Sequence, residues 1–180
     1  MSTLRHKIKP ILSALILIVC FSYILVKCLE ENTNQEETFT LLKAKFNLSV
    51  LRSGSAENVH YDPRNAQKSF LMGCKVKYMI LKGREELTGL ERLIEFDNDS
   101  INRITVRKTT YRKKINANEE EMNWYNIKKD SVYVLDFKKR KKEIYRKIKL
   151  VKTVDMKSDD ENENYIYTVK SQTEEKYNCN

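Results

Sequence analysis

The sequence predicts a β-dominated domain, either all-β or α+β, in which an antiparallel meander follows one hydrophobic N-terminal helix. Three observations support this prediction. About seven short stretches are rich in β-branched and aromatic residues, polar connectors separate them, and no long amphipathic helical pattern is visible. Short connectors favour a meander, and a flat sheet of that size leaves two edges unpaired. We therefore expect the sheet to close into a barrel or a sandwich.

The composition is that of one folded domain. The 180 residues include 34 Lys and Arg against 25 Asp and Glu, which gives a net charge of +9, and 41% of them are hydrophobic. That hydrophobic fraction is too high for a disordered chain. The charged fraction of 33% is too high for a polytopic membrane protein.

The N-terminus predicts export. Residues 1–28 hold four basic residues and no acidic one, and an unbroken apolar run of 16 residues spans positions 11–26. A basic flank before an apolar run is typical of a secretory signal, but this run is long enough that a retained signal-anchor also stays open. Glutamates follow the run, so the body is predicted to be secreted, or lumenal or extracellular in a single-pass membrane protein.

Four parts follow from these patterns: a signal peptide or signal-anchor at 1–28, an acidic connector at 29–39, a β-rich domain at 40–172 and a C-terminal tail at 173–180. The first strand is predicted within residues 40–52, where apolar side chains recur with a period of two. Its apolar side holds Leu42, Ala44, Phe46, Leu48 and Val50.

Residues 53–69 carry Gly and Pro turn signals and are predicted to be a loop. Alternation and β-branched residues then predict strands at residues 71–82, 101–112, 131–137, 144–154 and 165–170. Residues 90–96 are ambiguous between helix and strand, and 96–100 are a turn by composition. Residues 115–130 fit either a short helix or a hairpin connection.

Two cysteines and two sequons belong to the body of the chain. In an oxidising compartment, Cys74 and Cys179 are predicted to form a disulfide bond rather than to persist as a buried thiol and a tail thiol. Asn47 and Asn98 each begin an N-x-Ser sequon, and both are predicted to lie on exposed positions where a glycan could be attached.

Positive charge is concentrated in one stretch. Residues 101–152 contain 17 basic and 6 acidic residues, a difference of +11. The densest part predicts a basic hairpin, with candidate polyanion-binding residues Lys138, Lys139, Arg140, Lys141, Lys142, Arg146, Lys147 and Lys149. In an exported protein its partner would be an anionic glycan, a lipid headgroup or an acidic protein, and no nucleic acid is expected. A solubilising strand edge, or neutralisation by the acidic segment that follows residue 154, would explain the same pattern.

The sequence contains no recognisable catalytic or metal-binding motif. His60 is the only histidine of the body, and the two body cysteines do not form a C-x-x-C pair, so neither a metal site nor a cofactor is predicted. Ser53, Ser55, His60 and Asp62 lie in one polar loop. Such residues are more often turn-forming than catalytic, so no catalytic residue is predicted.

These observations favour a non-enzymatic binding protein that contacts an anionic partner through the basic hairpin. A lipocalin-like carrier is an alternative, in which a barrel interior would be lined by Tyr133, Tyr145, Tyr165 and Tyr167. The G-x-W signature usual in that group is absent. A single-pass membrane subunit is the third possibility, if the apolar run is retained.

Overall fold

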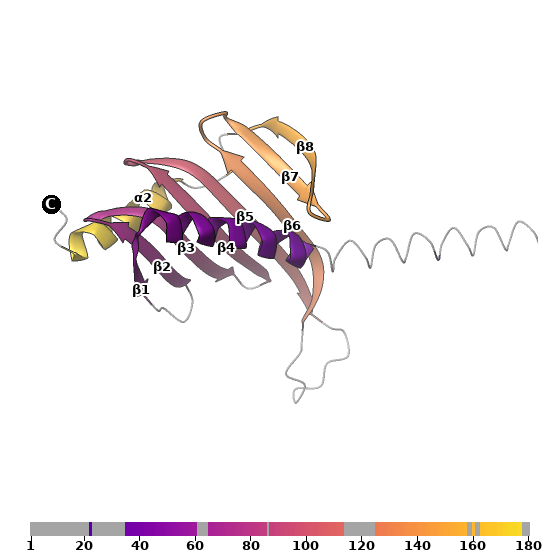
Figure 1. Ribbon diagram of the computed structural model, residues 1–180. Coiled ribbons are helices and arrows are strands. Elements are labelled where there is room, and N and C mark those ends of the chain that lie inside the picture. Colours follow the sequence, from indigo (N-terminus) through magenta and orange to yellow (C-terminus); the bar gives the residue numbers. More distant parts are fainter. Residues whose placement is uncertain are drawn as a thin grey trace, which may run out of the picture.

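An eight-stranded antiparallel meander organises the chain, in the order β1-β2-β3-β4-β5-β6-β7-β8 (Figure 1). The computed structural model describes residues 22, 35–60, 65–85, 87–113, 125–157, 160 and 163–177. The β-dominated α+β class and the meander are confirmed. The predicted closure into a barrel or sandwich is wrong, because β1 and β8 are the two open edges of the sheet. Helices cover its faces instead, so the sheet buries apolar surface without closing on itself.

The strands are β1 (Ala56–His60), β2 (Asn65–Met72), β3 (Lys75–Glu85), β4 (Thr88–Asp97), β5 (Ser100–Lys113), β6 (Tyr125–Asp136), β7 (Lys141–Arg146) and β8 (Lys149–Asp155). The predicted loop at 53–69 was wrong, because most of it forms β1 and β2. The predicted strand at 144–154 is split by a turn between β7 and β8. The strand predicted at 101–112 is confirmed as β5.

The predicted strand at 40–52 is a helix. Residues 35–53 are helical in the described part of the chain, and we call them the N-terminal helix. Its buried residues Phe39, Phe46 and Val50, with Leu42 packed beside them, follow the three-to-four-residue spacing of a helix. A period of two and a period of four fit Leu42, Phe46 and Val50 equally well, so these residues alone do not distinguish a strand from a helix. The buried positions extend back to Gln35, and a pattern of that length favours a helix.

The predicted strand at 165–170 is also wrong, because it lies inside the helix α2 (Glu163–Lys176). The buried face of α2 is partly polar. Its members are Ile166, Val169, Lys170, Thr173 and Glu174. These positions have helical spacing, but three of the five side chains are hydrophilic. Apolar periodicity therefore does not reveal this helix in the sequence.

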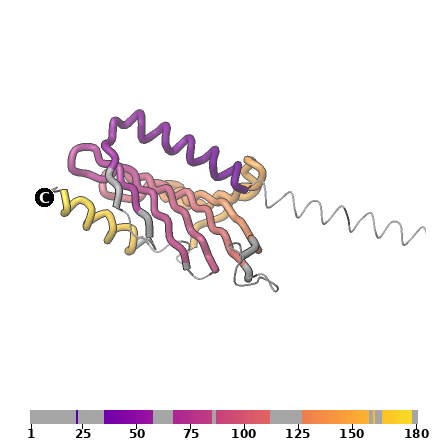
Figure 2. Tube along the Cα trace, turned by 90° about the horizontal axis from the view of Figure 1, so that it is seen from below, coloured from indigo at the N-terminus to yellow at the C-terminus, as the bar shows by residue number. Residues whose placement is uncertain are grey.

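The two helices lie on opposite faces of the sheet, which gives three layers (Figure 2). Alternate side chains of the middle strands point to opposite faces. Ile80 and Leu93 pack with Phe46 of the N-terminal helix. On the other face, Met79 and Ile94 pack with Ile166 of α2. The middle of the sheet is therefore buried on both sides.

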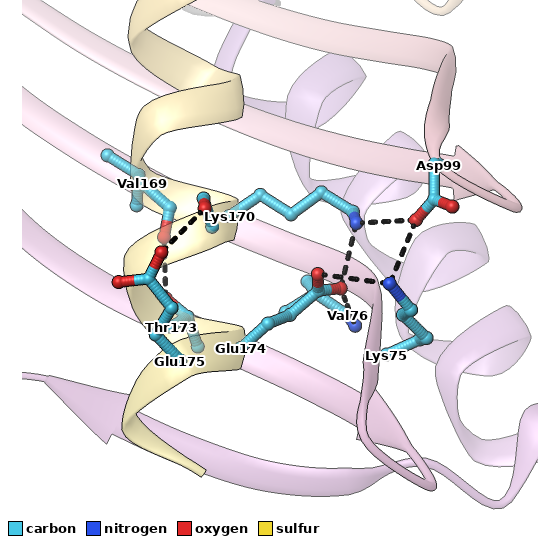
Figure 3. Close-up of polar contacts among 9 residues, drawn as sticks. Lys75, Val76, Asp99, Val169, Lys170, Thr173, Glu174 and Glu175 are labelled. Carbon is cyan, nitrogen blue, oxygen red and sulfur yellow. Dashed lines mark hydrogen bonds and ion pairs between the residues drawn. The ribbon is translucent and has the colours of Figure 1, made fainter. Parts of the chain in front are cut away.

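A buried polar network fixes α2 to the sheet (Figure 3). The Glu174 carboxylate accepts hydrogen bonds from the backbone N–H of Val76 at 2.9 Å and from Lys170 Nζ at 2.8 Å. Lys170 Nζ also donates to Asp99 at 3.0 Å, which lowers the pKa of Asp99 below its usual range. The Lys75 ammonium lies 3.6 Å from Glu174 and 3.4 Å from Asp99. The network thus joins α2 to the start of β3 and to the β4–β5 turn.

Replacing Glu174 with Gln tests this network. We expect Glu174→Gln to lower the free energy of unfolding by about 2–3 kcal/mol, because the side chain of Lys170, only 6% exposed, loses the buried one of its two carboxylate partners and keeps only the exposed Asp99. Chemical denaturation measures the loss. Glu175→Gln is the matched control on the exposed side of the same helical turn, where Glu175 accepts only from Ser171, and it should change stability little. Equal losses in the two variants would contradict this role for Glu174.

Candidate functional site

The basic stretch predicted from the sequence occupies both ends of β7, so it is not one continuous patch (Figure 1). Lys138, Lys139 and Arg140 lie in the β6–β7 turn. Lys147 lies in the β7–β8 turn at the opposite end of the sheet. At about 3.3 Å per residue, the six residues of β7 separate the two turns by about 20 Å. The two ends must therefore be considered separately.

Acidic side chains neutralise the β6–β7 end. Lys138 Nζ lies 2.6 Å from Asp97, and this hydrogen bond lowers the pKa of Asp97. Lys139 Nζ lies 3.4 Å from Asp136, and the backbone N–H of Lys139 donates to the same carboxylate at 3.0 Å. Two of the three cations in this turn thus already have an anionic partner within the chain.

The lysines of β7 are paired as well. Lys141 Nζ lies 2.6 Å from Asp155, and Lys142 forms an ion pair with Asp160. Burial is the largest single influence on Asp160 and acts to raise its pKa, but Lys142 and Lys157 together outweigh it, so the net effect is a lowered pKa. Lys142 Nζ also lies 4.4 Å from the ring centroid of Tyr133. Asp155 and Asp160 of the acidic stretch therefore neutralise two lysines of the basic strand, one of the arrangements that the sequence left open.

The β7–β8 end differs from the β6–β7 end because it holds exposed lysines that form no ion pair in the described part of the chain. Arg146, Lys147, Lys149 and Lys152 are all exposed. Across the described ranges, no ion pair joins Lys149 or Lys152 to a carboxylate. Lys152 was missing from the sequence-based candidates, although it is the last residue of the dense basic stretch at 137–152. We call residues 146–152 the hairpin tip.

The turn at the hairpin tip has an unusual backbone. Arg146 pairs with Lys149, so only Lys147 and Ile148 form the turn. Their φ angles are 48° and 66°, the left-handed values that a two-residue type I′ turn requires. Gly and Asn normally occupy such positions, and a β-branched residue there is strained. The backbone N–H of Ile148 donates to Thr38 Oγ1 at 2.9 Å, which ties the turn to the first described turn of the N-terminal helix.

Exposed apolar side chains accompany these cations. Ile148 is 49% exposed, Leu150 50% and Val151 53%. The sequence pattern did not indicate this feature, because it predicts one continuous strand over residues 144–154 with no turn at Ile148. The turn carries neither Gly nor Asn-Gly, so the usual hairpin signal is absent from the sequence.

The predicted tyrosine-lined interior does not form. Tyr133 packs with the α2 face of the sheet and Tyr145 with the opposite face. Tyr165 and Tyr167 belong to α2. The open sheet therefore places Tyr145 on the face opposite Tyr133 and Tyr167, so the four tyrosines do not line one interior.

A small hollow of about 240 Å³ lies elsewhere on the sheet, and no sequence pattern had indicated it. Its lining includes Arg107, Glu91 and Lys82. Arg107 Nη2 donates to the buried carboxylate of Asp130 at 2.9 Å, and Lys82 Nζ lies 3.5 Å from Glu91. The charges in this hollow thus largely neutralise one another.

Both sequons begin at exposed positions. Asn47 is exposed on the N-terminal helix rather than on a strand. Asn98 lies at the β4–β5 turn with a φ of 55°, in agreement with the predicted turn at 96–100. Modification at either site stays a prediction.

The polar loop of Ser53, Ser55, His60 and Asp62 shows turn chemistry where it is described. Ser53 Oγ donates to the backbone carbonyl of Val50 at 2.6 Å and lies 2.6 Å from Ser55 Oγ. The side chain of His60 and the whole of Asp62 lie outside the described residues. In the ranges that are described, no group of three or more His, Cys, Asp or Glu could hold a metal ion.

No known family model, curated protein or solved structure matches this chain. The predicted apolar run at 11–26 lies outside the described residues except for Ser22. Among the described helices, none has the length and apolarity needed to cross a membrane.

Cys74 is an exposed free cysteine at the β2–β3 turn, and Cys179 lies outside the described residues, so their disulfide stays a prediction. The structure makes it geometrically accessible. Glu174 touches Val76, two residues after Cys74, and the three residues from the end of α2 at Lys176 to Cys179 can reach about 10 Å. We expect non-reduced peptide mapping of the exported protein to recover a Cys74–Cys179 pair. Complete alkylation of both thiols without reductant would contradict the bridge.

The strained turn generates a stability prediction. We expect the double substitution Lys147→Asn with Ile148→Gly to raise the free energy of unfolding by about 1 kcal/mol, because Asn-Gly suits left-handed backbone and relieves about 1–2 kcal/mol per residue. The lost burial of half an Ile side chain, about 1 kcal/mol, offsets part of this gain. Urea denaturation measures the difference. Clear destabilisation would mean that the Ile148 side chain contributes more than the turn strain.

Proposed function

We propose that the chain is a non-enzymatic binding protein, secreted or anchored by its N-terminal segment, and that the hairpin tip contacts an anionic partner. One observation carries the proposal: Lys149 and Lys152 are exposed and have no acidic partner in the described ranges, whereas Lys138, Lys139, Lys141 and Lys142 are all ion-paired.

Electrostatics supports the choice of the hairpin tip over the β6–β7 turn. Four cations within seven residues repel one another, and an anionic surface that approaches them removes this repulsion. Each Lys or Arg close to such a surface contributes about 1 kcal/mol. A cation that is already paired with Asp contributes less binding free energy, because the anionic ligand must first displace that Asp carboxylate.

The chemistry of the partner follows from lysine. A lysine ammonium acts as a point charge and does not select a planar bidentate group, so sulfate, phosphate and carboxylate are all acceptable ligands. An anionic glycan, a lipid headgroup and an acidic protein share these groups. Lysines on the edge strand β8 also discourage pairing with other chains, so a purely solubilising role must be tested against binding.

Charge reversal at the two ends of β7 separates these roles. We expect Lys149→Glu with Lys152→Glu to weaken retention on immobilised heparin by at least about tenfold, because two contributions of about 1 kcal/mol are lost. The melting temperature should stay close to that of the wild type, because both side chains are exposed.

The matched control is Lys138→Glu with Lys139→Glu, which changes the net charge of the chain by the same amount at the β6–β7 turn. Retention of this control should fall much less. Equal losses in both variants would show that heparin senses only the overall charge of +9, and unchanged retention in both would mean that the cations are solubilising.

A further inference from the structure

We propose that the anionic partner is a lipid surface, and that the hairpin tip rests on it with Ile148, Leu150 and Val151 among the headgroups. This inference rests on the proposed function and deepens it, because it selects one class of partner. The carrying observation is the combination of exposed cations with exposed apolar side chains on the same few residues.

The apolar side chains decide between partner classes. A sulfated glycan offers few apolar groups to Ile148, Leu150 or Val151, each of which is about half exposed. The boundary between headgroups and acyl chains offers both phosphate charge and hydrocarbon. Segments that combine Lys or Arg with large apolar residues bind there, with a strength that scales with buried apolar area and with attraction to anionic lipids.

The position of the turn relative to the N-terminal segment points the same way. The N–H of Ile148 bonds to Thr38, in the first described turn of the N-terminal helix. Only eight residues separate the apolar run at 11–26 from Gln35, and they can span at most about 30 Å. If that run is retained in a bilayer, this short connection keeps the hairpin tip close to the membrane surface.

Acidic groups near the hairpin tip leave Lys149 and Lys152 without an ion pair among the described residues. Glu37 is exposed next to Thr38 on the N-terminal helix. Glu143 of β7 accepts a hydrogen bond from Tyr145 at 2.9 Å. Neither carboxylate forms an ion pair with Lys149 or Lys152.

The backbone conformation of the turn helps to keep the Ile148 side chain exposed. Left-handed φ at a β-branched residue is unfavourable, and such strain persists only where the surrounding structure imposes it. The hydrogen bond to Thr38 and the pairing of Arg146 with Lys149 supply this constraint.

Single-tryptophan variants of the full chain test the contact. Trp124→Phe removes the native tryptophan, and Leu150→Trp places a probe on the hairpin tip. The control probe is Met72→Trp, because Met72 is 49% exposed at the end of β2, on the opposite edge of the domain. Each variant is reconstituted into vesicles of phosphatidylcholine alone and into vesicles with about a third phosphatidylserine.

We expect the Leu150→Trp emission to shift to shorter wavelength in the anionic vesicles, with quenching by brominated acyl chains at least about twofold stronger than in phosphatidylcholine. The Met72→Trp probe should behave alike in both vesicles. Identical emission of the Leu150→Trp probe in the two vesicles, or an equal response of the control probe, would overturn the lipid proposal.

A second variant guards against misfolding of the tryptophan probes. Ile148→Asn removes the apolar side chain, keeps every lysine and tolerates left-handed φ. It should lose at least about half of its sedimentation with anionic vesicles while heparin retention stays unchanged. If Ile148→Asn is retained on heparin and also binds anionic vesicles as strongly as the wild type, the lipid surface is rejected. The proposed function would then still stand. A wild-type chain that binds neither heparin nor anionic vesicles would reject both.

Discussion

Burial of the middle strands on both faces is the constraint on which this structure depends. Met79 and Ile80 are adjacent in β3, point to opposite sides, and are both buried. Leu93 and Ile94 repeat this arrangement in β4. A single antiparallel sheet of this kind must be covered on each face, so neither helix is dispensable. The same cover explains why the sheet stays open.

Acidic residues at and after the end of β8 determine which cations remain available. Asp155, the last residue of β8, pairs with Lys141, and Asp160, which follows β8, pairs with Lys142. These two carboxylates neutralise the lysines of β7. No ion pair joins Lys149 or Lys152 to a carboxylate within the described residues, so the positive charge that is left uncompensated lies toward the other end of β8.

The strand content and meander were predictable, because residues 101–112 alternate clearly and turn residues separate the strands. The helices were not. Phe46 and Val50 fit two periods at once, and the inner face of α2 relies on Lys170, Thr173 and Glu174, whose burial depends on distant partners such as Val76. The basic stretch was visible, but the sequence does not show that Lys138, Lys139, Lys141 and Lys142 are ion-paired while Lys149 and Lys152 are not within the described residues, because ion pairs across the fold leave no local signal.

Hydrogen–deuterium exchange on the full chain, with and without a soluble heparin oligosaccharide, tests the central claim most directly, because it shows which end of β7 binds. We expect slower exchange of backbone amides within residues 146–152 when heparin is present, with the exchange of residues 137–142 unchanged. Protection over residues 137–142 alone would contradict it and would assign binding to the β6–β7 turn, where the lysines are paired with Asp97 and Asp136.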